Sequence, residues 1–356
     1  MPTRMGSAGL TLDFAGPPSI LPARGGDVKQ VRLGGTNLSV SQLCLGTMMF
    51  GGKTDADESE RIIHRAIDAG VNFVDTADVY CEGRSEEIVG KALRGMRDKV
   101  VLASKVGMKV GDGPNDQGLS RFHVVRGVEA SLRRLGTDRL DLFYAHWPTT
   151  ALNLEEVLRA LDDLVRQGKI LYPACSNLPA WVFSRALWLQ DVRGFAPFVV
   201  GQYPYNLIER GVEVEILPMA AALKLGIVVY RPLSAGVLTG KYLEQTPQDA
   251  RGVTDDRLGP WSRKYSQGIR KLAAFAGSRG YTGGDAATAW IRSHPAVTAP
   301  IVGISRIEQL EENLKGFEWE MTPAERQELS EFFPTEVWEE QGGKFPSWRR
   351  SFEIMP

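Results

Sequence analysis

The chain has 356 residues, and its 42 basic and 43 acidic side chains leave a net charge of −1. This balance, without a long block of like charge, disfavours nucleic acid or an anionic membrane surface as a partner. The sequence has no run of 18 apolar residues, so no membrane span is expected, and the N-terminus lacks the pattern of a secretory signal. The three scattered cysteines, Cys44, Cys81 and Cys175, are typical of reduced thiols in a cytoplasmic protein.

Residues 1–30 are rich in glycine, proline and small side chains, so we expect a flexible extension there. Beyond them, short apolar runs alternate with segments of helical periodicity. Continuous apolar runs are typical of parallel strands that are covered on both faces. Eight such strands are expected, at residues 42–46, 71–75, 100–105, 140–146, 170–176, 198–202, 226–230 and 299–303.

The regular alternation of strand and helix predicts one (β/α)8 barrel over residues 31–340, followed by a tail at residues 341–356. A doubly wound sheet is the alternative, but no GxGxxG motif follows the first strand. Residues 239–265 are too long for a simple connection and are expected to form a lid, a binding loop or a disordered segment. Ser120 is an expected helix N-cap, and Thr322 with Pro323 and Glu325 predicts the start of a last helix.

Four ionisable residues follow neighbouring strands of this barrel. The second, third and fourth expected strands end at Asp75, Lys105 and His146, and Tyr80 lies five residues after Asp75. Each residue alone has an ordinary structural explanation, such as a helix cap or a packing side chain. Because the carboxyl ends of barrel strands share one face, their conjunction favours a catalytic site.

These residue types fit one chemical task. A tyrosine holds its proton at neutral pH, since its pKa is ~10. A nearby ammonium such as Lys105 stabilises the phenolate, and a carboxylate such as Asp75 holds the ammonium in place. Tyr80 is therefore a candidate general acid, and His146 can donate a hydrogen bond to a substrate oxygen. The group is suited to protonating a carbonyl oxygen while another group attacks the carbon.

Several long motifs resemble the aldo-keto reductase superfamily, particularly its bacterial and potassium-channel-β-subunit-like branches. They include GVNFVDTADVYCEGRSEEIVGKAL, LGTDRLDLFYAHWP, QYPYNLIER, PLSAGVLTGKY and IVGISRIEQLEEN, and the resemblance covers residues 31–333. It implies a (β/α)8 barrel that binds NADP(H) without a Rossmann fold. It also implies a catalytic tetrad of Asp75, Tyr80, Lys105 and His146, with hydride transfer from the nicotinamide to the carbonyl carbon.

The resemblance also implies a set of cofactor-binding residues. Arg306 is the best candidate for the 2′-phosphate, since a guanidinium offers forked donors. The alternative is an ordinary capped helix with a solvated Arg, which the motif context disfavours. Pro173, inside a central strand, and Arg231, where a small polar residue is usual, depart from the family pattern. The implied cofactor residues are Gly46, Thr47, Met48, Asp75, Ser176, Asn177, Gln202, Tyr230, Arg231, Pro232, Leu233, Ser234, Gly236, Lys241, Gly303, Ser305, Arg306, Gln309, Glu312 and Asn313.

The expected substrate is a small carbonyl compound or its alcohol, held by Met48, Phe50, Tyr80, His146 and Trp147. The leading hypothesis is an NADPH-dependent reductase of aldehydes or ketones. The alternative is a cofactor-binding regulatory or assembly subunit. A metal-dependent hydrolase ranks last, because the chain has four histidines and no His-x-His spacing, so no metal site is expected. A monomer and a homo-oligomer both remain open.

Overall fold

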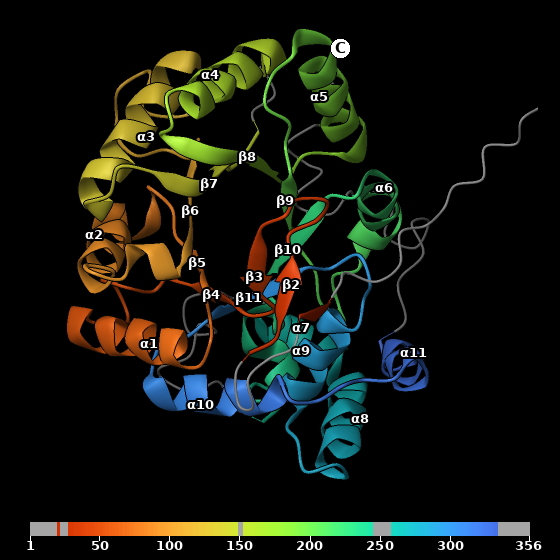
Figure 1. The fold of residues 1–356 in the computed structure, drawn as a ribbon. Coiled ribbons are helices and arrows are strands. Elements are labelled where there is room, and N and C mark those ends of the chain that lie inside the picture. The colour runs from red at the N-terminus through yellow and green to blue at the C-terminus, as the bar shows by residue number, and fades with distance from the viewer. Residues whose placement is uncertain (1–19, 22–27, 149–151, 245–257, 334–356) are drawn as a thin grey trace, which may run out of the picture.

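Eight parallel strands close into a barrel in this computed structural model (Figure 1), which describes residues 20–21, 28–148, 152–244 and 258–333. Each strand pairs with the next along the chain, and the last returns to the first, which confirms the predicted (β/α)8 fold. The expected tail at residues 341–356 lies outside the described residues. The barrel strands are β4 (Cys44–Gly46), β5 (Phe73–Asp75), β6 (Val101–Val106), β7 (Leu140–Ala145), β8 (Ile170–Ser176), β9 (Val200–Pro204), β10 (Gly226–Tyr230) and β11 (Ala299–Gly303).

Burial on both faces explains the continuous apolar strands. Every residue of β6 and β7 is buried. One cluster, which includes Phe73, Leu142 and Val228, fills the barrel interior, and a larger one lies between the strands and the helices. The sequence pattern predicted these strands because parallel sheets bury both faces.

Pro173 is accommodated at a break in the sheet. Its carbonyl accepts a hydrogen bond from the backbone N–H of Val199, at 3.3 Å, on the side of β9. The paired register of β8 with β9 starts only at Cys175. Pro173 has no N–H to donate, but it lies before the point where β8 and β9 pair in register. A proline is tolerated there because no ladder hydrogen bond is lost.

The helices form the outer ring, and the predicted caps are confirmed. The Ser120 side chain accepts a hydrogen bond from His123 N, and Thr322 and Glu325 form a capping box with Pro323 in the first turn. The described helices are α1 (Ala56–Asp68), α2 (Arg84–Ala92), α3 (Arg121–Leu135), α4 (Leu154–Arg166), α5 (Ala180–Arg193), α6 (Ile216–Leu223), α7 (Leu258–Lys264), α8 (Ser266–Gly277), α9 (Gly283–Arg292), α10 (Ile307–Gly316) and α11 (Pro323–Glu331), with short 3-10 turns η1 (Tyr80–Gly83), η2 (Arg97–Lys99), η3 (Gly211–Glu213) and η4 (Ser234–Thr239).

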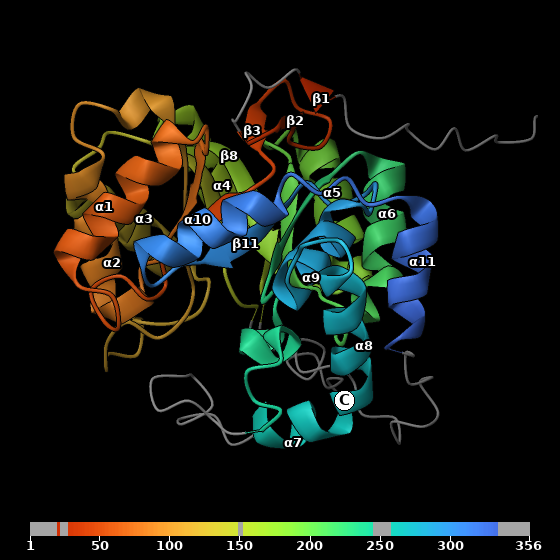
Figure 2. The same cartoon turned by 90° about the horizontal axis from the view of Figure 1, so that it is seen from below.

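A small antiparallel sheet closes the amino-terminal end of the barrel (Figure 2). It consists of β1 (Ile20–Leu21), β2 (Gln30–Arg32) and β3 (Ser39–Ser41). Leu33 has no exposed surface and packs in the barrel interior. The expectation of a flexible extension through residue 30 is therefore corrected at residues 20–21 and 28–30, which belong to or adjoin this sheet.

The described part of the long segment, residues 239–244 and 258–265, lies at the opposite end of the molecule from this sheet. It holds α7, at the bottom of Figure 2. The remainder, residues 245–257, lies outside the described residues. A lid or binding loop at this segment stays a prediction.

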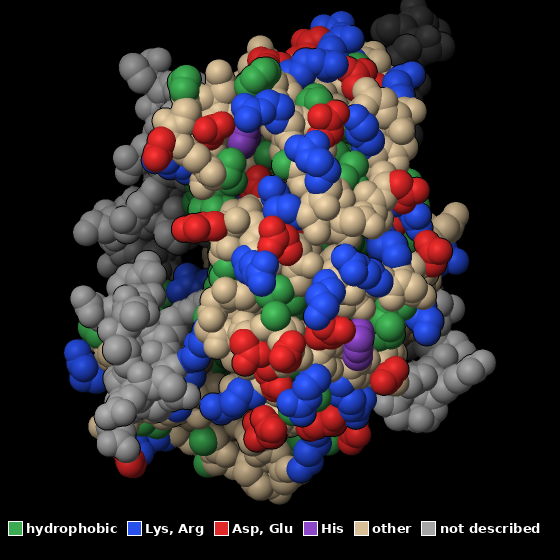
Figure 3. All heavy atoms as spheres, turned by 90° about the vertical axis from the view of Figure 1, so that its left-hand side faces the viewer, with side chains coloured by type: hydrophobic (Ala, Val, Ile, Leu, Met, Phe, Trp, Pro, Cys, Tyr) green, Lys and Arg blue, Asp and Glu red, His purple; other side chains and the backbone are tan. Residues whose placement is uncertain are grey.

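The outer face over α1 and α2 mixes basic and acidic side chains (Figure 3). Arg61 pairs with Glu58 at 2.7 Å, and Lys91 pairs with Glu60 at 2.9 Å. Among the described helices, none has the length and apolar character needed to span a membrane. Within the same described residues, no group of three or more His, Cys, Asp and Glu side chains could hold a metal ion.

Candidate active site

Lys105 contacts two of the other expected catalytic residues, Asp75 and Tyr80, at the carboxyl ends of β5 and β6. Its ammonium donates to Asp75 Oδ1, to the Tyr80 hydroxyl at 3.0 Å and to the Thr76 carbonyl at 2.7 Å. The Lys105 side chain has no exposed surface, and Asp75 is 2% exposed. All three ammonium protons are thus used in a site from which water is excluded.

The turn after β5 places Tyr80 over Lys105. Tyr80 opens the η1 turn, where Cys81 and Glu82 have φ angles of 47° and 57° before α2 begins. A buried hydroxyl network holds this turn, since Ser85 Oγ lies 2.9 Å from Thr47 Oγ1 and 3.0 Å from Thr76 Oγ1. Thr47, expected to line the cofactor site, has no exposed surface, so its side chain stabilises the turn instead.

Burial and the Lys105 charge control the ionisation of the cluster. Burial raises the pKa of Tyr80, and Lys105 offsets this effect only in part. Burial opposes the charged form of Lys105, yet Asp75 and Tyr80 together hold its pKa above the ordinary value. Lys105 favours the phenolate, in the direction expected from the sequence, but desolvation is the larger effect and leaves the pKa of Tyr80 raised.

His146 lies beside Tyr80 as a neutral ring. Their ring centroids are 6.1 Å apart at an interplanar angle of 81°. Burial, with a further effect of the Lys105 charge, holds the pKa of His146 well below its usual range. His146 Nδ1 is buried and has no hydrogen-bond partner among the described residues. A neutral imidazole retains one N–H that it can direct at an oxygen.

The residues expected to bind the nicotinamide amide adjoin this cluster. Gln202 Nε2 donates to Asp75 Oδ2 at 2.9 Å, and Ser176 Oγ donates to the Gln202 carbonyl at 3.0 Å. The Tyr230 hydroxyl donates to Asn177 Oδ1 at 2.9 Å. Gln202 therefore orients the carboxylate that holds Lys105, a contact that the sequence did not indicate.

The loop after β10 has an unusual backbone. Arg231, Ser234, Ala235 and Gly236 have φ angles of 59°, 48°, 55° and 93°. Ser234 N donates to the Arg231 carbonyl and Gly236 N donates to the Leu233 carbonyl, each at 2.9 Å, so these bonds hold the loop in shape. Ser234 Oγ is buried without a hydrogen-bond partner among the described residues, and the Lys241 side chain lies against Gly236. These residues fit the pyrophosphate of a dinucleotide.

The expected adenosine-phosphate segment includes an acidic neighbour. Ser305 N donates to Gln309 Oε1 at 2.9 Å, and Asn313 Nδ2 donates to the Gln309 carbonyl at 2.6 Å. Glu58 of α1 accepts a hydrogen bond from Ile307 N, at 2.7 Å, at the start of α10. Sequence reasoning missed Glu58, because 249 residues separate it from Ile307.

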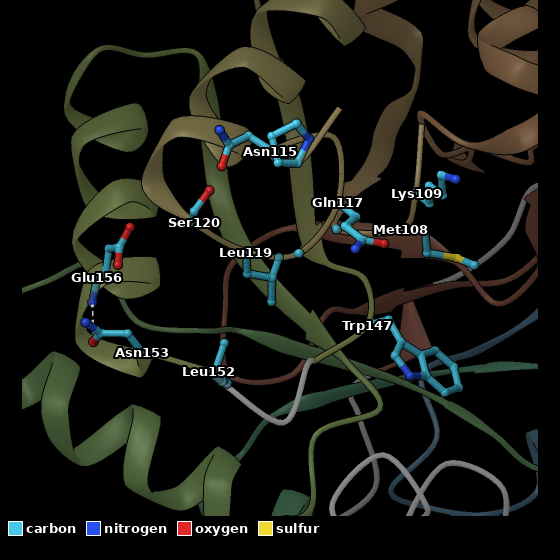
Figure 4. A pocket seen from close by; sticks show the side chains of 13 residues that line it. Met108, Lys109, Asn115, Gln117, Leu119, Ser120, Trp147, Leu152, Asn153 and Glu156 are labelled. Carbon is cyan, nitrogen blue, oxygen red and sulfur yellow. Dashed lines mark hydrogen bonds between the residues drawn. The ribbon is translucent and has the colours of Figure 1, made fainter. Parts of the chain in front are cut away.

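A cavity of about 670 Å³ is lined by residues that follow β6 and β7 in the chain, and Lys105 lies near the end of β6 while His146 directly follows β7 (Figure 4). Of the expected substrate residues, Trp147 lines it, and Met48 is 42% exposed. Phe50 is completely buried in the core, which corrects its expected place in the pocket wall. We call this space the β6–β7 cavity, and its lining is Gly107, Met108, Lys109, Pro114, Asn115, Gln117, Gly118, Leu119, Ser120, Trp147, Leu152, Asn153 and Glu156.

Asp78 is a further buried acid that the sequence did not single out. It is 5% exposed. Burial and the nearby charge of Glu86 raise the pKa of Asp78 to about 7, against the opposing effects of Arg134, the Val79 backbone N–H and Lys105. It lies two residues before Tyr80, in the turn that positions the phenol.

The barrel and its buried Asp–Lys–Tyr cluster define a class of protein, a single-domain (β/α)8 barrel with an acid–base group at the carboxyl ends of its strands. The model of the Aldo/keto reductase family matches residues 42–333. The chain therefore belongs to this family of oxidoreductases, as its motifs indicated.

Relatives cover most of the chain. An uncharacterized oxidoreductase of Bacillus subtilis, YrpG, is 37% identical over 85% of this chain and 95% of its own length. A probable voltage-gated potassium channel subunit beta of Arabidopsis thaliana is 36% identical over 80% and 89%. An aryl-alcohol dehydrogenase [NADP(+)] of Phanerodontia chrysosporium is 31% identical over 84% of each chain.

Proposed function

We propose that the chain is an NADPH-dependent carbonyl reductase, which converts an aldehyde or ketone to an alcohol with Tyr80 as the proton donor. The observation that carries the proposal is the Lys105 ammonium, buried between the Asp75 carboxylate and the Tyr80 phenol. A buried cation next to a phenol serves little purpose in folding, but it stabilises the phenolate that remains after proton transfer.

Each residue of the site has a distinct role in the proposed reaction. Tyr80 holds its proton at neutral pH, because burial raises its pKa, and gives it to the carbonyl oxygen. Lys105 stabilises the resulting phenolate, and Gln202 keeps Asp75 in place to hold Lys105. Neutral His146 directs its N–H to the same oxygen and polarises the carbonyl.

NADPH, when bound, supplies the hydride. The residues that would hold it are Gln202, Asn177 and Ser176 at the amide, Ser234 and Lys241 at the pyrophosphate, and Arg306 with Ser305 at the 2′-phosphate. The buried Ser234 hydroxyl, which has no hydrogen-bond partner among the described residues, supports this assignment. The name of the Phanerodontia relative, which specifies NADP(+), also supports it.

The experiment that tests the proposal is a spectrophotometric assay of NADPH oxidation against aryl aldehydes, dialdehydes, sugars and pyridoxal, with a metal chelator present. Turnover that persists with the chelator and disappears in Tyr80→Phe is the expected result. Absence of turnover with every carbonyl tested, in protein shown to bind NADPH, would contradict the reductase assignment.

A second candidate is a cofactor-binding regulatory or assembly subunit. It is favoured by the relatives from Arabidopsis thaliana and Oryza sativa, whose names are probable potassium channel β subunits. The complete tetrad favours the reductase, since a purely structural subunit has no need of a proton donor. Cofactor binding without reduction in the assay above is the outcome that would favour this alternative.

A further inference from the structure

The β6–β7 cavity adjoins the catalytic residues on two strands. Gly107 lies two residues beyond Lys105 on β6, and Trp147 directly follows His146 after β7. A carbonyl group between Tyr80 and His146 therefore has the Trp147 end of the cavity next to it. This location gives the rest of an elongated substrate a place to extend.

The cavity combines apolar and polar side chains in its middle and has a polar far end. In Figure 4, Trp147 and Met108 lie at one end and Glu156 with Asn153 lies at the other. Leu119 and Leu152 lie in between, with Asn115 and Ser120 on one side. Its volume of about 670 Å³ falls within the range of pockets that bind drug-sized molecules. It is larger than a short aldehyde needs.

Two backbone donors at the far end are already used. Glu156 Oε1 accepts a hydrogen bond from Arg121 N, at 2.8 Å, at the start of α3. Asn153 Oδ1 accepts from Glu156 N at 3.3 Å, at the start of α4. Helix amino termini attract anions, but here Glu156 is itself the anion at the start of α3. A substrate carboxylate at this end would meet the charge of Glu156.

Glu156 places a negative charge at the far end of the cavity, whereas Lys109 lies near the Trp147 end (Figure 4). The charged lining residues are Lys109 and Glu156. Lys109 pairs with Asp112 at 2.8 Å, whereas Glu156 forms no ion pair within the described part of the chain. The local field at the far end therefore disfavours a carboxylate and favours a cation or a neutral hydroxyl.

From these observations we infer that the β6–β7 cavity binds the distal part of an elongated carbonyl substrate, and that Glu156 selects neutral or cationic ends over carboxylates. The inference rests on the proposed reductase function, because it assumes that the reacting carbonyl lies at Tyr80. The substrate class is an aldehyde or ketone with an apolar middle and an uncharged polar or cationic end.

The test compares aryl aldehydes of equal length that end in a hydroxyl, a trimethylammonium or a carboxylate, with the unsubstituted aldehyde as reference. The wild type should have the lowest kcat/KM for the carboxylate. Glu156→Gln keeps an acceptor for Arg121 N but removes the charge. It should therefore reduce the ratio of kcat/KM for the hydroxyl-ended aldehyde to kcat/KM for the carboxylate-ended one about fivefold, as expected for one partly solvated charge pair.

The matched control is Glu155→Gln, because Glu155 is the neighbouring carboxylate, pairs with Arg193 at 3.0 Å and does not line the cavity. Glu155→Gln should leave the ratio of kcat/KM values for the hydroxyl-ended and carboxylate-ended aldehydes unchanged. Equal kcat/KM for all three ends in the wild type, or equal shifts in both variants, would overturn the inference while the unsubstituted aldehyde is still reduced. If no aldehyde is reduced, the proposed function fails, and melting-temperature shifts with the three corresponding alcohols still decide the selectivity of the cavity.

Discussion

Lys105 and Asp75 form an ion pair in which the side chains are 0% and 2% exposed. The pair joins two adjacent strands, and each charge has further partners, Thr76 and Tyr80 for the ammonium and Gln202 for the carboxylate. Buried charges persist only when they are paired and hydrogen-bonded. The pair therefore bears on the stability of the barrel as well as on its chemistry.

Lys105→Met should destabilise the protein by about 3–5 kcal/mol, because it leaves the Asp75 carboxylate buried without a cation. It should also abolish measurable reduction, since nothing else bonded to Tyr80 stabilises a phenolate. Urea denaturation measures the first effect, and the NADPH assay measures the second. The double variant Asp75→Asn with Lys105→Met should regain part of the stability but none of the activity. An unaltered denaturation midpoint in Lys105→Met would contradict this account of the pair.

Asp78→Asn should stabilise the protein at pH 8 and flatten its pH dependence. The folded protein has a carboxyl pKa of about 7 at Asp78, against 3.8 as the ordinary value. Between these values the folded state binds more protons than the unfolded state, so this carboxyl lowers stability as pH rises from about 4 to about 7. Asparagine does not titrate, and the gain at pH 8 is at most about 4 kcal/mol. Melting temperatures at pH 5 and pH 8 measure it.

Asp112→Asn is the control for this prediction, since the Asp112 side chain is 98% exposed. It should leave the pH dependence of the melting temperature unchanged. If Asp78→Asn is equally destabilised at both pH values, the Asp78 carboxylate has hydrogen-bond partners that the structure does not show.

Arg306→Ala should weaken NADPH binding about 10–150-fold and leave NADH binding nearly unchanged. The reason is the loss of a charge-assisted hydrogen bond, worth ~1.5–3 kcal/mol, to the 2′-phosphate that only NADPH carries. Fluorescence titration of both cofactors measures the change. Equal losses for the two would mean that Arg306 contacts the shared part of the cofactor.

Glu58→Gln should shift the cofactor preference in the other direction, toward NADPH by about fivefold. The Glu58 carboxylate accepts a hydrogen bond from Ile307 N. It therefore places a negative charge next to Arg306, where the 2′-phosphate is proposed to bind. Glutamine keeps an acceptor for that N–H without the charge. Glu60→Gln is the control, because Glu60 lies on the same helix and, like Glu58 with Arg61, pairs with a basic side chain, Lys91, but does not contact Ile307 N. A ratio of NADPH to NADH affinity that moves equally in both variants would contradict this role of Glu58.

The fold was predictable because its signals are local. Each barrel strand is a short apolar run, and the residues that end β5, β6 and β7 are readable one strand at a time. The convergence of Asp75, Lys105 and Tyr80 then follows from the rule that barrel strands share one carboxyl face.

The features of the structure that the sequence did not predict depend on contacts between residues far apart in the chain, which no local pattern encodes. Glu58 meets Ile307 across 249 residues. Phe122 recurs at helical spacing with Val125, Val128 and Leu132, a periodicity that predicts a buried face, yet it is 55% exposed and lies beneath Arg126. Phe50 shows the opposite error, since a residue expected in the pocket packs in the core. Such outcomes are decided by which neighbour covers a side chain, and periodicity carries no information about that.

The most direct test of the central claim is the Tyr80→Phe variant, assayed for both NADPH binding and carbonyl reduction. Phenylalanine keeps the shape of the ring and removes the hydroxyl that Lys105 contacts at 3.0 Å. Tyr281→Phe, which alters a ring stacked on Trp319 at 4.7 Å, is the control. The account predicts a turnover number lower by about 10²–10⁴-fold with NADPH affinity within about twofold of wild type. Turnover near the wild-type value in Tyr80→Phe would contradict it.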